Sequence, residues 1–318
     1  MKSASCLSDR HRYSGHETFA CRYAWLIKAV TAVAAEPDIL ITKREDDAMS
    51  ELGVGKNMVR SIRFWAEAAG VLRSCENGHA VSDFGRELFL GVGWRHGKKR
   101  AGLDPYLEDI QSLWLIHWRL ATNKDALIFA WDFLLNRFQE PDLHSAAVLR
   151  AFEKELASSK ISKGSMEQLW NVFLHSYVPT RGRKGEVRED NLDCPLVELD
   201  LLIPSGFVES SSHSGRAEAK FAFRRESKPE IGGGLFVYCL GEFWQNHHQQ
   251  EKSVTMHLVA NGHGSPGQVF KLPEDDIRNR LLDIEDSSNG LFVFEDSAAI
   301  PRVRRTSDVP VPLELVYE

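Results

Sequence analysis

Residues Leu52–Leu72 read LGVGKNMVRSIRFWAEAAGVL, and they decide the fold of the N-terminal part of the chain. An apolar stripe at helical spacing consists of Val59, Ile62, Ala66 and Ala69. It predicts a helix from about Lys56 to Ala69 with one face toward a core. The candidate DNA contacts on its other face and first turn are Lys56, Asn57, Arg60 and Arg63. Recognition helices touch DNA through their first turns, so this helix is expected to read DNA; an ordinary solvated helix face is the alternative.

The segments on both sides of this helix complete a winged-helix outline. A helix is expected over Glu17–Ala35, ended by Pro37, and a second one over Glu45–Leu52. Gly53-Val54-Gly55 then permits a tight turn into the third helix. After the third helix, Asn77-Gly78 lies between two short extended segments, which predicts a hairpin. A helix-turn-helix followed by a hairpin indicates a winged-helix domain. The alternative is an ordinary helical subdomain.

The length of the chain predicts more than one domain. At 318 residues with 43% hydrophobic content, it can form two or three cores. We expect a winged-helix-like DNA-binding domain over 1–100, a helical domain over 101–180 and an α+β domain over 181–318. A second predicted hairpin, with strands at Phe207-Val208 and Lys220–Arg224, suggests a second winged-helix-like module in the last of these. The predicted fold class is therefore α+β and predominantly α-helical.

The middle of the chain is rich in aromatic residues. They follow a helical period from Trp114 through Phe138, which is typical of a buried core rather than of a platform for stacked bases. Further helices are expected over Ala146–Leu156, Ser165–Leu174 and Pro195–Leu202.

Nothing in the sequence predicts a membrane protein. The longest apolar stretches are interrupted by Lys28 or Asp132 and fall short of the ~20 residues that cross a bilayer. The N-terminus lacks the apolar core of a secretory signal. The five cysteines show no metal-ligand spacing and are expected to be buried or free thiols. We therefore expect a cytoplasmic protein.

Basic residues concentrate in short segments, although the formal net charge of −6 argues against a protein that binds nucleic acids indiscriminately. One basic loop is expected over Gly93–Arg100, a second over Thr180–Arg188 and a third over Pro301–Arg305. The candidate DNA contacts in the first two loops are Arg95, Lys98, Lys99, Arg100, Arg181, Arg183 and Lys184. Together with the third helix, these loops favour a groove that follows phosphates. Solvated loops are the alternative for each.

Three blocks of sequence resemble a known family. They are YSGHETFACRYAWLIKAV (Tyr13–Val30), LGVGKNMVRSIRFW (Leu52–Trp65) and DPYLEDIQSLWLIHW (Asp104–Trp118). In this order they are similar to the signature blocks of a bacterial family encoded in phosphorothioate-based phage-defence clusters, which includes the B subunit of the Ssp systems. EDNLDCPLVELDLL (Glu189–Leu202) is a weaker similarity.

The resemblance implies a DNA-acting subunit of the machinery that replaces a non-bridging phosphate oxygen with sulfur. The partners it implies are DNA, an ATPase and sulfur-transfer subunits, and the B subunit is described as a DNA nickase. Two other interpretations stay open. One is a non-catalytic adaptor that recognises DNA and docks the other subunits. The other is a winged-helix transcription regulator, which would form a homodimer on a symmetric operator.

Nicking of a strand would require Mg²⁺ or Mn²⁺ held by carboxylates and a water made nucleophilic. No common nuclease spacing is present, but two groups fit these roles. His16 and Glu17 in the first block pair a candidate base with a metal ligand, whereas a helix N-terminus is the alternative role for Glu17. Asp190 and Asp193 follow the second basic loop, which would place catalytic or metal-binding carboxylates beside phosphate-binding cations. Helix capping is the competing explanation for a third acidic group, at Asp104, Glu108 and Asp109.

Overall fold

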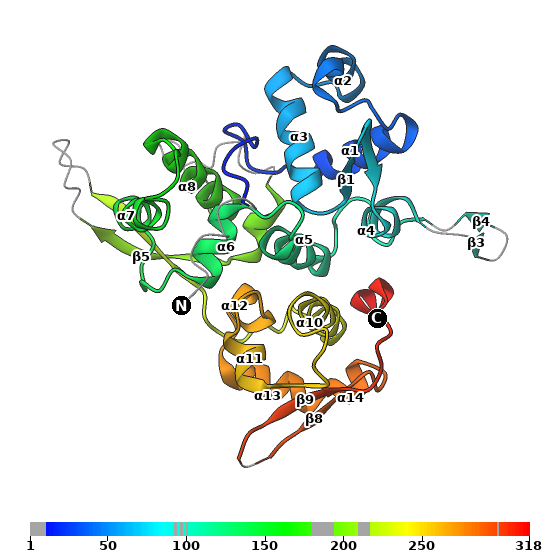
Figure 1. Cartoon of the computed structure of the whole chain (residues 1–318), viewed down its shortest axis with the longest axis vertical. Coiled ribbons are helices and arrows are strands. Elements are labelled where there is room, and N and C mark those ends of the chain that lie inside the picture. Colours follow the sequence, from blue (N-terminus) through cyan, green and yellow to red (C-terminus); the bar gives the residue numbers. More distant parts are fainter. Residues whose placement is uncertain are drawn as a thin grey trace.

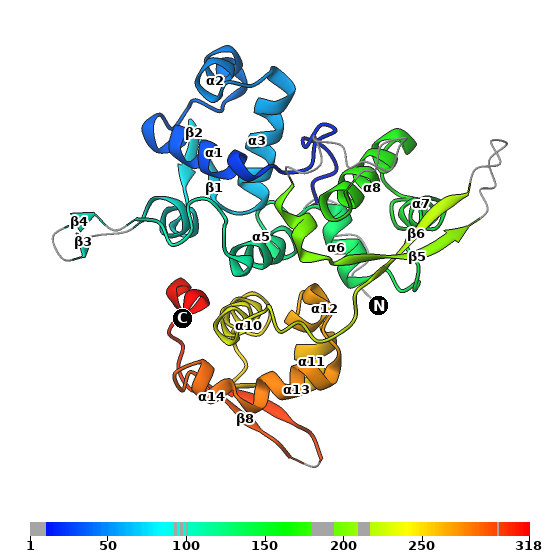
Figure 2. The same cartoon turned by 180° about the vertical axis from the view of Figure 1, so that it is seen from behind.

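The chain folds into an upper part that contains the N-terminal helices and a lower part that contains the C-terminal ones, as Figures 1 and 2 show. The structure is a computed structural model that describes residues 11–91, 94–95, 98–99, 101–179, 194–208, 217–297 and 299–318. Its strands form only small antiparallel sheets between many helices in this described part. The predicted α+β class is confirmed.

The elements predicted around the opening stretch are present. They are α1 (Tyr23–Ala35), α2 (Glu45–Leu52), α3 (Lys56–Ala68), β1 (Leu72–Cys75) and β2 (Gly78–Val81), and a 3-10 helix, η1 (Thr42–Arg44), precedes α2. Gly53 ends α2 in the left-handed conformation with φ of 66°, so the glycine turn is confirmed. β1 and β2 pair as an antiparallel hairpin in which Cys75 lies opposite Gly78.

The prediction that the first helix begins at Glu17 is wrong. α1 begins at Tyr23, because the preceding segment binds α3 with its own backbone. Ser61 of α3 donates to the carbonyl of His16 at 2.8 Å, and the indole of Trp65 donates to the carbonyl of Phe19 at 3.1 Å. Carbonyl groups used in this way are not available to a helix, so the segment stays irregular.

The middle helices enclose the aromatic core. Before them lie the short elements α4 (Asp83–Gly85), η2 (Arg86–Leu90), β3 (Trp94–Arg95) and β4 (Lys98–Lys99). The helices are α5 (Ile110–Thr122), α6 (Phe129–Asn136), α7 (Ser145–Glu155) and α8 (Lys163–Tyr177). Trp114, Trp118 and Trp131 are fully buried, which confirms the prediction that the aromatic stripe is core. Asp109 is the N-cap of α5 and its side chain accepts from the amide of Gln111 at 2.8 Å, so the capping explanation is confirmed for Asp109. Asp104 accepts from the amides of Glu108 and Asp109 in the turn before this helix.

A long hairpin follows the segment that begins at Cys194. Its strands are β5 (Leu202–Val208) and β6 (Glu218–Phe223), which confirms the second predicted hairpin. The expected helix over Pro195–Leu202 is instead a short 3-10 helix, η3 (Pro195–Leu199). It ends at Asp200, whose positive φ of 45° turns the chain into β5.

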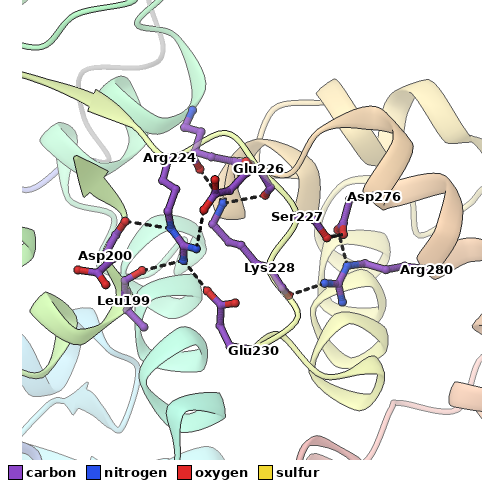
Figure 3. Close-up of polar contacts among 10 residues, drawn as sticks. Leu199, Asp200, Arg224, Glu226, Ser227, Lys228, Glu230, Asp276 and Arg280 are labelled. Carbon is purple, nitrogen blue, oxygen red and sulfur yellow. Dashed lines mark hydrogen bonds and ion pairs between the residues drawn. The ribbon is translucent and has the colours of Figure 1, made fainter. Parts of the chain in front are cut away.

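The connection between the two parts of the chain is held by buried charges, which Figure 3 shows in close-up. Lys228 is fully buried and donates to the carbonyls of Arg224, Glu226 and Lys271. Arg280 in turn donates to the carbonyl of Lys228 at 2.7 Å. Burial, together with the charge of Arg224, lowers the pKa of Lys228 to about 8. These hydrogen bonds give partners to backbone carbonyls of the linker that would otherwise be buried without them.

The C-terminal part packs helices around a small sheet. Its helices are α10 (Gly233–His247), α11 (Met256–Asn261), α12 (Pro266–Phe270), α13 (Glu274–Leu282), α14 (Ile284–Ser287) and the 3-10 helix η4 (Leu313–Tyr317). Its strands are β7 (Ser253–Thr255), β8 (Phe292–Glu295) and β9 (Arg302–Arg305), in the order β7-β9-β8. No helix in the described ranges is long and apolar enough to span a bilayer.

Gly234→Ala is expected to lower the free energy of unfolding by about 1–3 kcal/mol, the range for overpacked sites. A Cβ at this second position of α10 would lie 1.8 Å from the carbonyl oxygen of Leu315, so η4 would have to move. Gly164 occupies the second position of α8, where a Cβ would meet only Ser162 Oγ at 3.9 Å. Gly164→Ala is therefore the matched control and is expected to stabilise by up to about 1 kcal/mol. Urea unfolding measures both, and equal midpoints would contradict the prediction.

Candidate nucleic-acid interface and catalytic residues

The face of α3 that carries the predicted DNA contacts is the face turned to solvent. Lys56 and Asn57 are exposed, and Arg60 and Arg63 are half-buried. On the other side, the apolar stripe that includes Val59 is buried. The helical spacing of the sequence therefore predicted correctly that these cations lie on the solvent side of α3. A cavity of about 650 Å³ lies between this helix and the β1–β2 hairpin, and its lining includes Lys43, Arg63, Glu67 and Asn77.

Acidic and carbonyl groups of the protein already hold the α3 cations in place. Glu45, the first residue of α2, accepts from Arg60 Nε at 2.8 Å and lies 3.1 Å from Lys56 Nζ. The pKa of Glu45 is lowered to about 2, mainly by its hydrogen bonds from Arg60. Burial opposes this shift, and the hydrogen bond from Lys56 adds to it. Arg63 donates to the carbonyl of Leu40 at 3.0 Å. The side chains are thus oriented, and part of their charge is neutralised before any ligand arrives.

His16 is a packing residue in this structure. Its side chain is buried, its Nδ1 donates to the carbonyl of Glu17 at 2.8 Å, and its ring packs edge-on against Phe64. Burial, only partly offset by that hydrogen bond, lowers the pKa of His16. The imidazole is therefore neutral near pH 7. Its catalytic role stays a prediction.

Glu17 lies close to the cationic face of α3. Its φ of 52° places it in a left-handed turn rather than in the first turn of α1, so the helix-terminus role is wrong. Its carbonyl accepts from the side chain of Gln168 in α8. The hydrogen bond and charge of Glu45, together with the charge of Glu17, raise the pKa of Arg60. A predicted metal ligand thus lies within electrostatic reach of a predicted phosphate contact.

The basic loops have different outcomes. β3 and β4 form a two-residue ladder that pairs Arg95 with Lys98 and Trp94 with Lys99. Arg100, Arg181, Arg183 and Lys184 lie outside the described residues, as do Asp190 and Asp193. The third loop was predicted wrongly, because Pro301–Arg305 contains β9, the central strand of its sheet. Val303 is buried between two arginines, an alternation that is typical of a strand with one covered face.

A buried carboxylate network was missed by the sequence reasoning. Asp132 of α6 is almost fully buried, and its partners are Arg137 at the end of α6 and two histidines from distant segments. His11 Nε2 lies 3.0 Å from its Oδ2, Arg137 donates to the same oxygen at 2.9 Å, and His263 Nε2 lies 2.8 Å from Oδ1. Burial raises the pKa of Asp132, but the hydrogen bonds from His11 and His263 and the nearby positive charges outweigh it and hold the pKa well below its usual range. The only sequence signal was a lone acid inside an apolar run.

This network borders a cavity of about 430 Å³. Asp132 and Arg137 line it from the upper part of the chain, and His247 and His263 line it from the lower part. α6 and α12, the helix that follows the His263 loop, lie side by side in Figures 1 and 2. The site therefore lies where the two parts of the chain meet.

Comparison with known families now identifies the chain. A family model described as "Protein of unknown function (DUF4007)" matches residues 13–315. The chain belongs to the DUF4007 family. No curated protein matches its sequence.

Two solved structures resemble this DUF4007 chain over nearly its whole length. An SspB crystal structure has a TM-score of 0.76 and 25% sequence identity, and it covers 95% of this chain and 85% of that one. A magnesium ion-bound SspB crystal structure has a TM-score of 0.75 and 24% identity at the same coverage. The resemblance to the Ssp B subunit that the three sequence blocks predicted is confirmed.

The described residues of this DUF4007 chain do not assemble a magnesium site. They contain no group of three or more His, Cys, Asp or Glu side chains arranged to hold a metal ion. Of the three predicted ligands, only Glu17 falls within the described ranges. Mg²⁺ or Mn²⁺ binding by Glu17, Asp190 and Asp193 stays a prediction.

Proposed function

We propose that this protein is the DNA-binding subunit of a bacterial DNA phosphorothioate modification and phage-defence system, and that it nicks one strand so that sulfur can be incorporated. The observation that carries the proposal is the α3 face, where Lys56, Arg60 and Arg63 lie on the solvent side of a helix that follows a glycine turn and precedes a hairpin. The likeness to SspB over 95% of the chain supports it.

In this proposal, the segment 1–100 acts as a winged-helix DNA-binding domain. α3 enters the major groove, the β1–β2 hairpin serves as the wing, and the cavity between them faces the phosphates. The arginines act through charge and bidentate hydrogen bonds to phosphate oxygens. The helical domain covers 101–180 and the C-terminal α+β domain covers 181–318. The partners are DNA, the ATPase, the sulfur-transfer subunits and a second copy of the chain. The reaction takes place in the cytoplasm.

A supercoiled-plasmid assay tests the enzymatic part. The purified full-length protein is incubated with plasmid and Mg²⁺ or Mn²⁺, and we expect nicked circles that EDTA abolishes. Glu17→Gln, Asp190→Asn and Asp193→Asn are tested beside it, because each keeps the side-chain size and removes a ligand charge. Loss of nicking with retained gel mobility shift would assign that residue to the metal site.

The same assay separates the alternatives. Intact plasmid under every metal condition, together with a gel shift, would contradict nicking and support the non-catalytic adaptor. A symmetric footprint made by a dimer on one defined sequence would instead support the transcription regulator.

A further inference from the structure

The Asp132–His263 pair has the geometry of a catalytic dyad. His263 Nε2 lies 2.8 Å from Asp132 Oδ1, so Nε2 carries the proton and the other ring nitrogen, Nδ1, is left to accept one. The side chain of His263 is 52% exposed, whereas that of Asp132 is 3% exposed. A buried carboxylate that orients a solvent-facing imidazole is the arrangement that general-base catalysis uses.

Asp132 itself is firmly held. Its second carboxylate oxygen has His11 and Arg137 as partners. Its backbone carbonyl accepts from the side chain of Asn136. The side-chain oxygen of Asn136 in turn accepts from the amide of Gly264 at 2.8 Å. Gly264 is the residue after His263. The loop that carries the imidazole is therefore tied to α6 by backbone as well as by side chain.

Two cations border the same cavity. Arg137 and the exposed Lys124 line the same cavity, although Arg137 also pairs with Glu155 and Lys124 donates to the carbonyl of Asn246. Burial, reinforced by the charge of Lys124, lowers the pKa of His247 to about 4, so this imidazole stays neutral beside them. His263 is thus a half-exposed histidine of this cavity, and the cations Arg137 and Lys124 line the cavity with it.

We propose that His263, oriented by Asp132, is the general base of the strand-nicking reaction in this inter-part cavity. The inference rests on the proposed nicking function and adds its proton acceptor. A water oxygen bonds to phosphorus while its proton moves to His263 Nδ1. The bond between phosphorus and the leaving deoxyribose oxygen breaks, and that oxygen keeps the electron pair and takes a proton from bulk water.

Nicking by His263→Ala tests the proposal. Because a positioned general base contributes about 10²–10⁴-fold, the first-order rate constant on bound plasmid is expected to fall by that factor. The Kd for DNA, measured by gel shift, should stay within about twofold, and added imidazole should restore part of the rate by supplying the missing proton acceptor. His257→Ala is the matched control, since His257 is a 78% exposed histidine in the neighbouring helix α11. It should nick at the unmodified rate.

The pH profile gives a readout that a structural role would not change. For a reaction that uses a general base, the rate of the unmodified protein should rise with pH, and this limb should be absent from His263→Ala. The other ionisable groups around the imidazole are Asp132, His11, Arg137, His247 and Lys124, and all of them remain in the variant.

The outcomes are distinguishable. If the unmodified protein nicks and His263→Ala nicks equally fast, the assignment of the base is overturned while the proposed function stands. If the unmodified protein nicks under no condition, the proposed function fails, and the proposed base fails with it.

Discussion

Asp132→Ala is expected to lower the free energy of unfolding by roughly 3–5 kcal/mol, the cost of breaking a buried ion pair from one side. The substitution would leave the guanidinium of Arg137 and the buried ring of His11 without their shared acceptor. It would also remove the carboxylate that links the upper part of the chain to His263. Urea unfolding followed by tryptophan fluorescence measures the change.

Two companion variants make this result interpretable. Asp132→Asn keeps the shape and one acceptor oxygen, so its loss should be smaller than that of the alanine variant. Asp142 is the matched control, because it accepts from Ser205 and Lys220 but its side chain is 35% exposed. Asp142→Ala should unfold close to the unmodified midpoint, since exposed ion pairs contribute little. An Asp132→Ala midpoint as high as that of Asp142→Ala would contradict the prediction.

The contribution of Asp132 to the free energy of unfolding should decrease in acid. The folded pKa of Asp132 lies below its unfolded value of about 3.9, so the stabilisation is fully present above that pH and is lost as the pH falls further. Asp132→Ala should therefore differ most from the unmodified protein near neutral pH. The difference should shrink in acid.

The features that local periodicity encodes were predictable. The apolar stripe of α3, the glycine turn at Gly53 and the Asn77-Gly78 hairpin depend on residues within one or two turns of each other, and all three are present. The start of α1 was not predictable in the same way. Tyr13–Phe19 bonds to Ser61 and Trp65 on α3, and these tertiary hydrogen bonds override the helical spacing that the segment carries.

Long-range partners explain what was missed at the candidate site. Asp132 contacts His11, which precedes it by 121 residues, and also His263 far along the chain. No spacing rule connects such positions. Glu45 is closer in sequence to Arg60, but the turn at Gly53-Val54-Gly55 decides whether their side chains meet, and its geometry is not visible in residue types. The sequence alone therefore predicted which helix face carries the cations, but it did not predict which charged side chains pair.

The second large effect is expected on DNA affinity, when the cations of α3 are removed. A variant with Lys56→Ala, Arg60→Ala and Arg63→Ala should bind DNA roughly 10- to 100-fold more weakly near 0.15 M salt. The variant makes fewer phosphate contacts, so fewer counterions leave the DNA when it binds. The slope of log K against log salt should become shallower by about 0.9 for each contact, or about 2.7 in total. Gel shifts across a salt series measure both quantities. The matched control removes the same charge elsewhere, with Lys252→Ala, Arg278→Ala and Arg150→Ala, which lie outside the predicted DNA contacts, and should leave the slope nearly unchanged.

Glu45→Gln gives the opposite sign and so tests the same helix without removing a cation. In the folded protein Glu45 holds Lys56 and Arg60 with its charge, and the substitution frees both for phosphate. We expect tighter binding and a steeper salt slope than in the unmodified protein. Weaker binding by the triple variant together with tighter binding by Glu45→Gln would place α3 at the DNA. If neither variant moves the slope, α3 lies away from the DNA and the basic loops must supply the contacts.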